Sequence, residues 1–385
     1  MHPVEEATSH STSEALMMVE DYLQTWRGQK QDTSENNLAN GVSTEEQMDL
    51  ILLIIILIIE IVNLAGLVGN ILNIAVFVRL GFSEPSNISL TALAAADLVS
   101  LVLSIWIGLC YWPPFRDSGL PFNPLNLSLH TGAGLRAHTI RTVACITAFI
   151  SFERCLCILM PLKVKRIITP KFTKTAMFII GIFTVVPYIV IYFRYYFAWV
   201  IYPHLNATIL DIVPNNSKGA ILMDQIVMAI CGVIQPIVSF VIVLVSTIFL
   251  IVQLRKIASW RKSVMSAGRR GQDNSEAESA PNTAVANAGS SKEERLTKMV
   301  VVIATNFIVC FVPTCVFFGL VVFEGFALFG SYRRKVVPVL LTSYLTESVS
   351  ASVNILIYYN MSAKFRSTLR LLLQLDAQAA QAKSD

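Results

Sequence analysis

Seven long apolar blocks follow one another along the chain, separated by short polar links. They run approximately over residues 50–78, 88–112, 131–160, 173–193, 220–254, 296–323 and 336–359. An α-helix rises ~1.5 Å per residue, so ~20 apolar residues cross the ~30 Å hydrocarbon core of a bilayer. Only 15% of the residues are charged, against about 25% in soluble domains. The sequence therefore predicts an all-α membrane protein, a bundle of seven transmembrane helices. The last block is the weakest, because Thr and Ser interrupt it.

The distribution of charge predicts how the bundle is oriented. Lys and Arg are concentrated in the links after the third and fifth blocks and in the C-terminal tail, and the positive-inside rule places these segments in the cytoplasm. Residues 1–49, with ten acidic side chains against two basic ones, are then an acidic, disordered extracellular tail. No apolar block follows Met1, so we expect no cleaved signal peptide. Arg333, Arg334 and Lys335 oppose this orientation but are outnumbered.

We therefore divide the chain into an extracellular tail at 1–49, a transmembrane domain at 50–360 and a C-terminal segment at 361–385. Within the transmembrane domain, residues 266–291 are rich in Gly, Ser, Ala and Asn, which predicts a flexible third cytoplasmic loop. The C-terminal segment places Phe365, Leu369, Leu372 and Leu373 at helical spacing, which predicts a short amphipathic eighth helix on the inner membrane surface.

Ionisable side chains inside spanning helices are energetically unfavourable, so they are the first functional candidates. Asp97 lies roughly 10 residues, or ~15 Å, into the second block, and Asn70 and Asn354 can reach the same depth. This group could bind sodium, take up a proton or only fix helix packing. At the end of the third block, Arg154 can pair with Glu153 and with Glu293, and so hold two helices together, or it can be a plain positive-inside arginine.

Two further features of the blocks suggest movement and recognition. Pro313 in the sixth block and Pro236 in the fifth remove a backbone hydrogen bond and kink the helix, which permits either a swing of its inner half or static curvature. Arg136 and Arg141 lie about 27 Å and about 20 Å from Arg154 along the third helix. Arg136 can snorkel to the rim, whereas Arg141 needs a partner, for which Glu347 is the candidate.

Six motifs in order resemble the rhodopsin-like (class A) G-protein-coupled receptors, over roughly residues 50–375. They are Gly69-Asn70, Leu93-Ala94-Ala95-Ala96-Asp97, Glu153-Arg154-Cys155, Pro236, Cys310-Phe311-Val312-Pro313 and Asn354-Ile355-Leu356-Ile357-Tyr358. The stretch 152–165 is similar to invertebrate, mollusc-type chemosensory and peptide receptors. The chain departs from the family pattern because Leu129 stands where a disulfide cysteine is expected, Ile355 replaces a proline, and Leu244 replaces a tyrosine.

The resemblance assigns roles to individual residues. It implies sodium-site candidates Asp97, Asn70 and Ser350, although Val143 replaces the usual serine there. It implies a ligand site that includes Phe311 and the outer half of the third helix. It also implies an activation switch made of Glu153, Arg154, Glu293, Pro313, Asn354 and Tyr358.

Of the two outer arginines, only one is expected to contact a ligand, because five residues place them ~140° apart around the helix. Arg136 is nearer the pocket mouth and has the family's ligand-contact position, so we predict that it binds a carboxylate or phosphate in bidentate fashion. The alternative is a structural Arg136. Arg141 is assigned to an internal pair with Glu347.

These features predict a plasma-membrane receptor that binds an extracellular peptide or small anionic chemosensory molecule and activates a heterotrimeric G protein. Membrane lipid is an expected partner, and we expect no nucleic acid, no cofactor and no metal other than sodium. No His, Cys or Ser group has catalytic spacing, so an enzyme is not expected. The alternatives are a transporter or an orphan seven-helix protein with weak coupling, although we find no internal repeat typical of transporters. Asn126, Asn206 and Asn215 are the glycosylation candidates.

Overall fold

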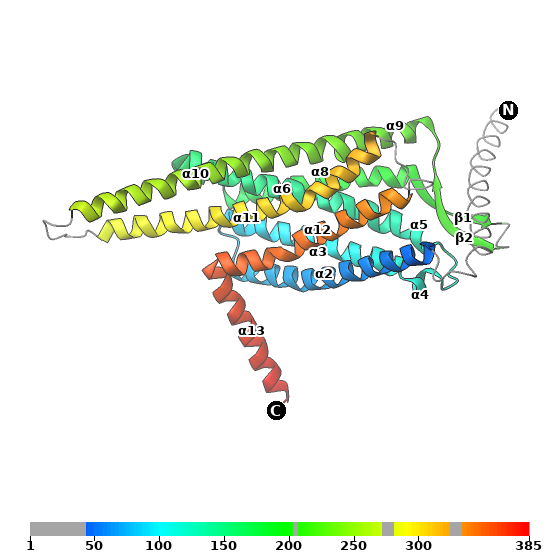
Figure 1. Ribbon diagram of the computed structural model, residues 1–385, viewed down its shortest axis with the longest axis horizontal. Coiled ribbons are helices and arrows are strands. Elements are labelled where there is room, and N and C mark those ends of the chain that lie inside the picture. The colour runs from blue at the N-terminus through cyan, green and yellow to red at the C-terminus, as the bar shows by residue number, and fades with distance from the viewer. Residues whose placement is uncertain (1–43, 203–206, 272–280, 324–332, 385) are drawn as a thin grey trace.

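The computed structural model describes residues 44–202, 207–271, 281–323 and 333–384. Its long helices run side by side as an elongated bundle, with a small β-hairpin at one end and a separate helix, α13, at the other (Figure 1). The long helices are α2 (Thr44–Leu80), α3 (Pro85–Tyr111), α6 (Gly134–Leu159), α8 (Pro170–Arg194), α10 (Gln235–Gly271), α11 (Pro281–Phe323) and α12 (Arg333–Met361).

Six helical stretches of the described chain are long and apolar enough to cross a membrane. They are Leu50–Leu80, Pro85–Tyr111, Pro124–Leu159, Pro170–Arg194, Lys218–Trp260 and Glu294–Phe317. These stretches match the first six apolar blocks, and the helical membrane bundle is confirmed to that extent. Helix α12 coincides with the seventh block and packs against α2 and α11, and its described residues are not among these six stretches.

The third spanning stretch begins earlier than residue 131, where the sequence analysis placed it. Pro124 opens α5 (Pro124–Ser128), and the side chain of Asn123 accepts hydrogen bonds from the backbone N–H groups of Leu125 and Asn126. This is a typical N-cap followed by proline in the first turn. A π-helical turn, η1 (Leu129–Ala133), then joins α5 to α6.

Another π-helical segment, η3 (Met228–Ile234), joins α9 (Lys218–Val227) to α10. The two remaining short helices are α4 (Pro113–Arg116) and α7 (Pro161–Ile167).

A β-hairpin between α8 and α9 is the one sheet of the described residues, and it lies in the link between two spanning stretches of the all-α bundle. Strands β1 (Tyr195–Tyr202) and β2 (Ala207–Pro214) pair antiparallel, with Tyr195 opposite Pro214. The hairpin is rich in aromatic and β-branched residues, which favour strands.

The hairpin is fastened to the end of the bundle through the buried side chain of Asp211. Its carboxylate accepts hydrogen bonds from the Tyr202 hydroxyl at 2.5 Å and from the Asn126 amide at 2.7 Å. Burial and the bond to Asp211 raise the pKa of Tyr202, so its hydroxyl remains a donor at neutral pH. The backbone N–H of Leu210 also donates to the carbonyl of Pro121 at 2.8 Å. Strand β2 is therefore held to α5 through a side-chain contact with Asn126 and to the segment before α5 through a backbone bond with Pro121.

Two helix bounds differ from the domain boundaries predicted from sequence. Helix α10 continues to Gly271 and α11 begins at Pro281, so helix covers most of the predicted flexible loop at 266–291. The reason is local: Pro281 suits a first helical turn, and the alanines that follow it have the highest helix propensity. Helix α13 (Ala363–Ser384) extends beyond the predicted amphipathic stretch, and its buried Phe365 and Leu369 belong to the core that contains Phe77 and Tyr358.

Candidate functional site

A buried ion pair joins three helices in the half of the bundle nearer the hairpin. The guanidinium of Arg136 on α6 donates to Oε2 of Glu347 on α12 at 2.7 Å, and the hydroxyl of Thr314 on α11 donates to Oε1 of the same carboxylate at 2.5 Å. The Arg136 guanidinium also lies over the ring of Tyr344, 4.1 Å from its centroid. The Arg136 side chain is 2% exposed and that of Glu347 is 9% exposed. We call Arg136, Thr314, Tyr344 and Glu347 the outer polar centre.

This geometry corrects the predicted pairing of Arg141 with Glu347. Arg141 is buried, and its Nη1 lies 3.3 Å from Nε2 and 3.4 Å from Nδ1 of the His138 ring. Among the residues that the structure describes, no carboxylate lies within 4.0 Å of it. The two arginines lie on different faces of α6, and Arg136 rather than Arg141 faces Glu347 on α12. Arg136, the predicted ligand contact, is thus already paired with an acid of the chain.

Asp97 on α3 forms a second buried centre, closer to the middle of the bundle. The amide of Asn354 on α12 donates to its carboxylate at 2.8 Å, so these two predicted partners do meet. Asn70 does not join them: its amide donates to the carbonyls of Gly66 at 2.9 Å and Ala351 at 3.0 Å. Ser350 accepts a hydrogen bond from Asn306 at 3.1 Å. The three predicted sodium-site residues, Asp97, Asn70 and Ser350, therefore belong to three separate hydrogen-bond networks.

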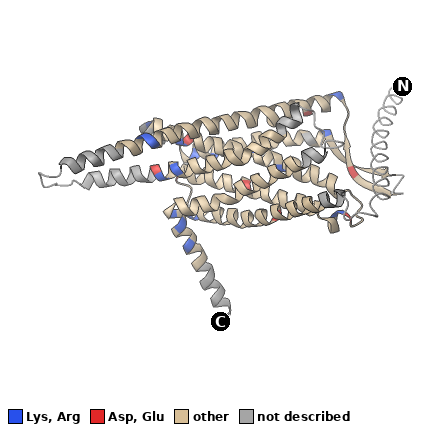
Figure 2. Ribbon diagram, in the orientation of Figure 1, with Lys and Arg blue, Asp and Glu red and all other residues tan. Residues whose placement is uncertain are grey.

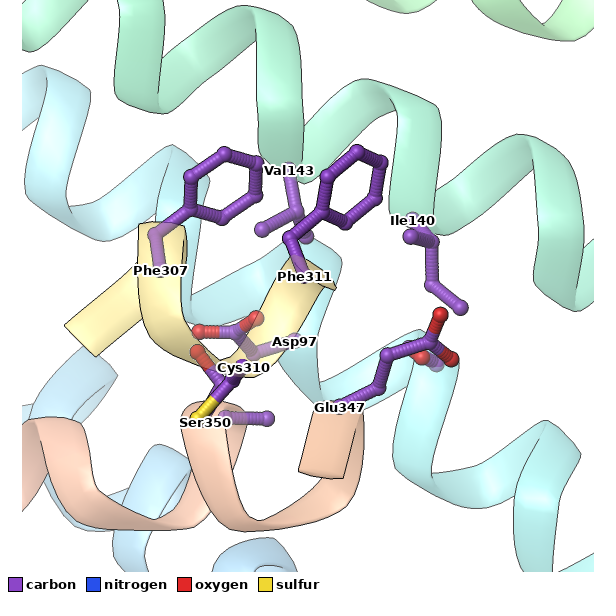
Figure 3. A pocket seen from close by; sticks show the side chains of 10 residues that line it. Asp97, Ile140, Val143, Phe307, Cys310, Phe311, Glu347 and Ser350 are labelled. Atoms are coloured by element: carbon purple, nitrogen blue, oxygen red, sulfur yellow. The ribbon is translucent and has the colours of Figure 1, made fainter. Parts of the chain in front are cut away.

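A small cavity of about 30 Å³ connects the region of Asp97 with that of Glu347. Figure 3 shows the two carboxylates on one side of it and the rings of Phe307 and Phe311 on the other, with Val143 behind. A volume of this size holds a water molecule or a small ion and no larger guest. The buried ring of Phe311 stacks on Phe307 with centroids 5.0 Å apart, two residues before Pro313 inside α11. The predicted toggle residue thus lies directly against the space between the two acids.

At the opposite end of α6, Arg154 forms an ion pair with the adjacent Glu153, and both are buried. Ser86 on α3 accepts a hydrogen bond from Arg154 at 2.9 Å and lies 3.4 Å from a Glu153 carboxylate oxygen. We call Ser86, Glu153 and Arg154 the inner polar centre. The side chain of Glu293, the predicted second partner of Arg154, lies outside the described residues. Tyr358 on α12 is buried, edge-on to Phe77 with ring centroids 5.2 Å apart.

The three glycosylation candidates have different surroundings. The Nδ2 atom of Asn126, where a glycan would be attached, donates to buried Asp211 at 2.7 Å. Asn126 is therefore a poor acceptor in this fold, which argues against that prediction. Asn215 lies just after β2, and its amide donates only a long bond of 3.3 Å to the carbonyl of Phe193. Asn206 lies outside the described residues.

Several functional candidates were missed by reasoning from sequence. Thr314 and Tyr344 complete the outer polar centre, and Ser86 completes the inner one. Neutral hydroxyl groups are common in spanning helices, so sequence alone did not distinguish them. Glu60 on α2 is different, because an acidic residue in an otherwise apolar block satisfies the same rule that selected Asp97.

Comparison with known protein families gives a match over most of the chain. The model of a family described as Serpentine type 7TM GPCR chemoreceptor Srw matches residues 57–376. The matched region extends from α2 into α13 and includes the outer and inner polar centres and the cavity between Asp97 and Glu347. No curated protein matches the chain. The match supports a seven-transmembrane receptor, and it does not single out the mollusc-type receptors suggested by residues 152–165.

Proposed function

The chain belongs to the Srw family of serpentine seven-transmembrane G-protein-coupled chemoreceptors, and from this premise we propose that it binds an extracellular anionic ligand and activates a heterotrimeric G protein. The observation that carries the proposal is the outer polar centre. A buried carboxylate that holds α6, α11 and α12 together is a contact that a ligand can break, with consequences for all three helices.

In this proposal α12 is the seventh membrane span. Its buried polar side chains, among them Ser343, Ser348 and Asn354, would face the interior of the bundle, which explains why hydropathy alone undervalues it. Its contacts with α2 and α11 would close the ring of helices. Helix α13 would be the eighth helix and would lie along the inner membrane surface, with Phe365 inserted towards the core.

We place the hairpin outside the cell and α13 inside, at the plasma membrane. Lys and Arg gather where α10, α11 and α13 leave the bundle, at the end opposite the hairpin (Figure 2), which agrees with the positive-inside rule. The test is glycan mapping by mass spectrometry on the chain expressed in a eukaryotic cell. We expect a glycan on Asn215 and none on Asn126. A glycan on Asn360 would require the opposite orientation.

The ligand would act by competing with Glu347 for Arg136. Arginine binds a carboxylate or phosphate through two parallel N–H donors, and the Nε of Arg136 has no hydrogen-bond partner in the described chain. A small chemosensory acid or a peptide C-terminus has the required charge. Once the ligand binds Arg136, Glu347 is released and α12 is no longer tied to α6. Arg141, which lacks an acidic neighbour in the described chain, is the alternative contact.

Activation would be a shift between two helix arrangements. Release of Glu347 would disturb the cavity beside Phe311, and the kink at Pro313 would let the inner half of α11 move. Asn354 and Asp97, with or without sodium, would carry the change toward Tyr358 and the inner polar centre. We propose Glu293 as a second partner of Arg154 in the resting state. Glu293→Ala should then raise basal signalling, and an unchanged basal level would remove Glu293 from the switch.

The deciding experiment is a ligand screen on cells that express the chain, with intracellular calcium and cAMP as readouts. Small carboxylates, phosphates and peptides with free or amidated C-termini should be compared. We expect the response to charged ligands to fall sharply in Arg136→Ala and to persist in part in Arg136→Lys. Each response is normalised to the amount of receptor at the cell surface. Equal losses for charged and neutral ligands would make Arg136 structural. Transport of a solute without any second-messenger change would favour a transporter instead.

A further inference from the structure

A groove between α2 and α3 holds an acidic side chain that the proposed signalling mechanism does not use. The groove has a volume of about 230 Å³, and Glu60 lies within it. Its apolar walls are Leu53, Ile56 and Leu57 of α2 and Ile105, Leu109 and Trp112 of α3. Leu57, Leu109 and Trp112 are 50%, 40% and 49% exposed, so the groove opens away from the bundle, toward the lipid.

Gly108 gives the Glu60 carboxylate its place in the groove. A Cβ atom at Gly108 would lie 2.0 Å from Oε1 of Glu60 and 2.6 Å from its carboxyl carbon. The carboxylate therefore rests against bare backbone in a notch that only glycine leaves open. Any larger residue at this position would push the carboxylate away, while the rest of the groove would be kept.

The charge of Glu60 is not neutralised by a direct ion pair. Within the described part of the chain, no Lys, Arg or His nitrogen lies within 4.0 Å of its carboxylate. Asn63 is its hydrogen-bonding neighbour, and Arg136 acts on it only from a greater distance. Arg136 is itself bound to Glu347 at 2.7 Å. A carboxylate inside a spanning helix without a cation is costly, so the groove has an unmet requirement for positive charge.

The position of Glu60 along α2 fixes the side from which a cation would arrive. Glu60 lies ten residues from Asn70, or ~15 Å along the helix, in the direction of the hairpin end. Trp112, at the rim of the groove, follows the last residue of α3 at the same end. A tryptophan at this place is typical of the membrane–water interface. The groove is thus reached from the lipid leaflet on the hairpin side of the bilayer.

We propose that this groove is a binding site for a protonated aliphatic amine that enters from that leaflet. The ammonium group pairs with Glu60 in the Gly108 notch, and the hydrocarbon chain lies along the apolar walls. Aliphatic amines resemble the lysine side chain, whose pKa is about 10.4, so they carry the required charge at neutral pH. Carboxylates are excluded by repulsion and alcohols lack the charge. The site is separate from the anionic ligand contact at Arg136 and does not depend on the proposed signalling role.

Trp112 supplies a direct signal for the test. The full chain, reconstituted in phosphatidylcholine vesicles, is titrated with 12-bromododecylamine, whose bromine quenches tryptophan fluorescence. The alcohol and the carboxylic acid with the same brominated chain serve as matched probes. We expect the amine to quench at much lower concentration than the other two. The Trp112→Phe variant should lose that component of the quenching, because its signal comes from the groove.

Two variants separate the charge from the shape of the groove. Glu60→Gln keeps the size of the side chain and should raise the half-quenching concentration of the amine by about tenfold or more, as expected for a charge-assisted hydrogen bond. Gly108→Ala keeps the charge but displaces the carboxylate, and should have a similar effect. The control is Asp117→Asn, since Asp117 is an exposed acid near the same end whose side chain is 62% accessible.

The expected result is loss of amine binding in both groove variants and unchanged binding in the control. Equal quenching by amine and alcohol would overturn the proposal, because the groove would then be an ordinary apolar surface. Unchanged amine affinity in Glu60→Gln would overturn it as well. If Glu60→Gln fails to fold, Gly108→Ala decides, since it leaves every charge of the chain in place.

Discussion

The outer and inner polar centres each contain an arginine of α6 paired with a glutamate, but the two pairs connect different parts of the chain. In the outer centre, Arg136 and Glu347 are 211 residues apart in sequence, and Thr314 brings in a third helix. In the inner centre, Glu153 and Arg154 are neighbours, and only Ser86 belongs to another helix. The outer pair therefore joins two helices, whereas the inner pair lies within one helix, at the end that we assign to coupling.

The largest effect should come from Arg136→Met. It leaves Glu347 buried without a cation, which typically costs about 3–5 kcal/mol. We expect a marked fall in the thermal stability of the purified chain and in its surface expression. The double variant Arg136→Met/Glu347→Leu should recover most of the loss, because no buried charge remains. A single variant as stable as the wild type would show that the outer pair does not hold the bundle together.

Arg154→Ala should separate signalling from stability. We expect it to abolish ligand-driven nucleotide exchange on the G protein, because Arg154 is the cation at the end of α6 that we assign to coupling. Its stability should fall less than that of Arg136→Met, since the ion-pair partner of Arg154 is on the same helix, whereas Arg136 ties α6 to α12. Normal nucleotide exchange, measured at equal receptor levels, would contradict the assignment of coupling to the inner centre.

Thr314→Val tests whether α11 belongs to the outer centre. The substitution preserves volume and removes the hydrogen bond to Glu347, and a bond to a charged group contributes about 1.5–3 kcal/mol. We expect a moderate loss of thermal stability and higher basal signalling, because α11 is less firmly attached to α12. The matched control is Thr342→Val, an exposed residue of α12 whose hydroxyl bonds only its own helix. Equal effects of the two variants would show that the hydrogen bond from Thr314 does not tie α11 to the outer polar centre.

Ser86→Ala should have the smallest effect of the four. It removes the α3 hydroxyl that accepts a hydrogen bond from Arg154 at 2.9 Å and donates one to Glu153 at 3.4 Å. The ion pair within α6 stays intact, so we expect a stability loss of roughly 1 kcal/mol. A loss as large as that of Thr314→Val would mean that the inner centre, like the outer one, holds helices together, and the contrast between them would fail.

Hydropathy predicted six of the spanning stretches because their lipid-facing surfaces are apolar, as the exposed side chains of Ile61 and Phe178 illustrate. It undervalued α12, whose polar residues are buried. The sequence also showed which ionisable residues lie in the membrane, but not which of them meet. Pairing depends on the rotation of each helix about its axis, and that rotation decided between Arg136 and Arg141 as the partner of Glu347. The side-chain contact between Asn126 of α5 and Asp211 of β2 likewise depends on how the hairpin packs against the bundle, which the sequence does not show.

The π-helical segment Met228–Ile234 has a consequence for how the protein can change over time. A π turn holds about one residue more than an α turn, so the residues on its two sides are out of phase by ~100°. Helices α9 and α10 follow one another without a break in helical structure. A 3.6-residue period counted across the π-helical segment nevertheless assigns side chains to the wrong face. Losing one residue there would leave length and hydropathy almost unaltered. It would nevertheless turn the face that α9 presents at the hairpin end by ~100°, while the inner end of α10 would keep its packing.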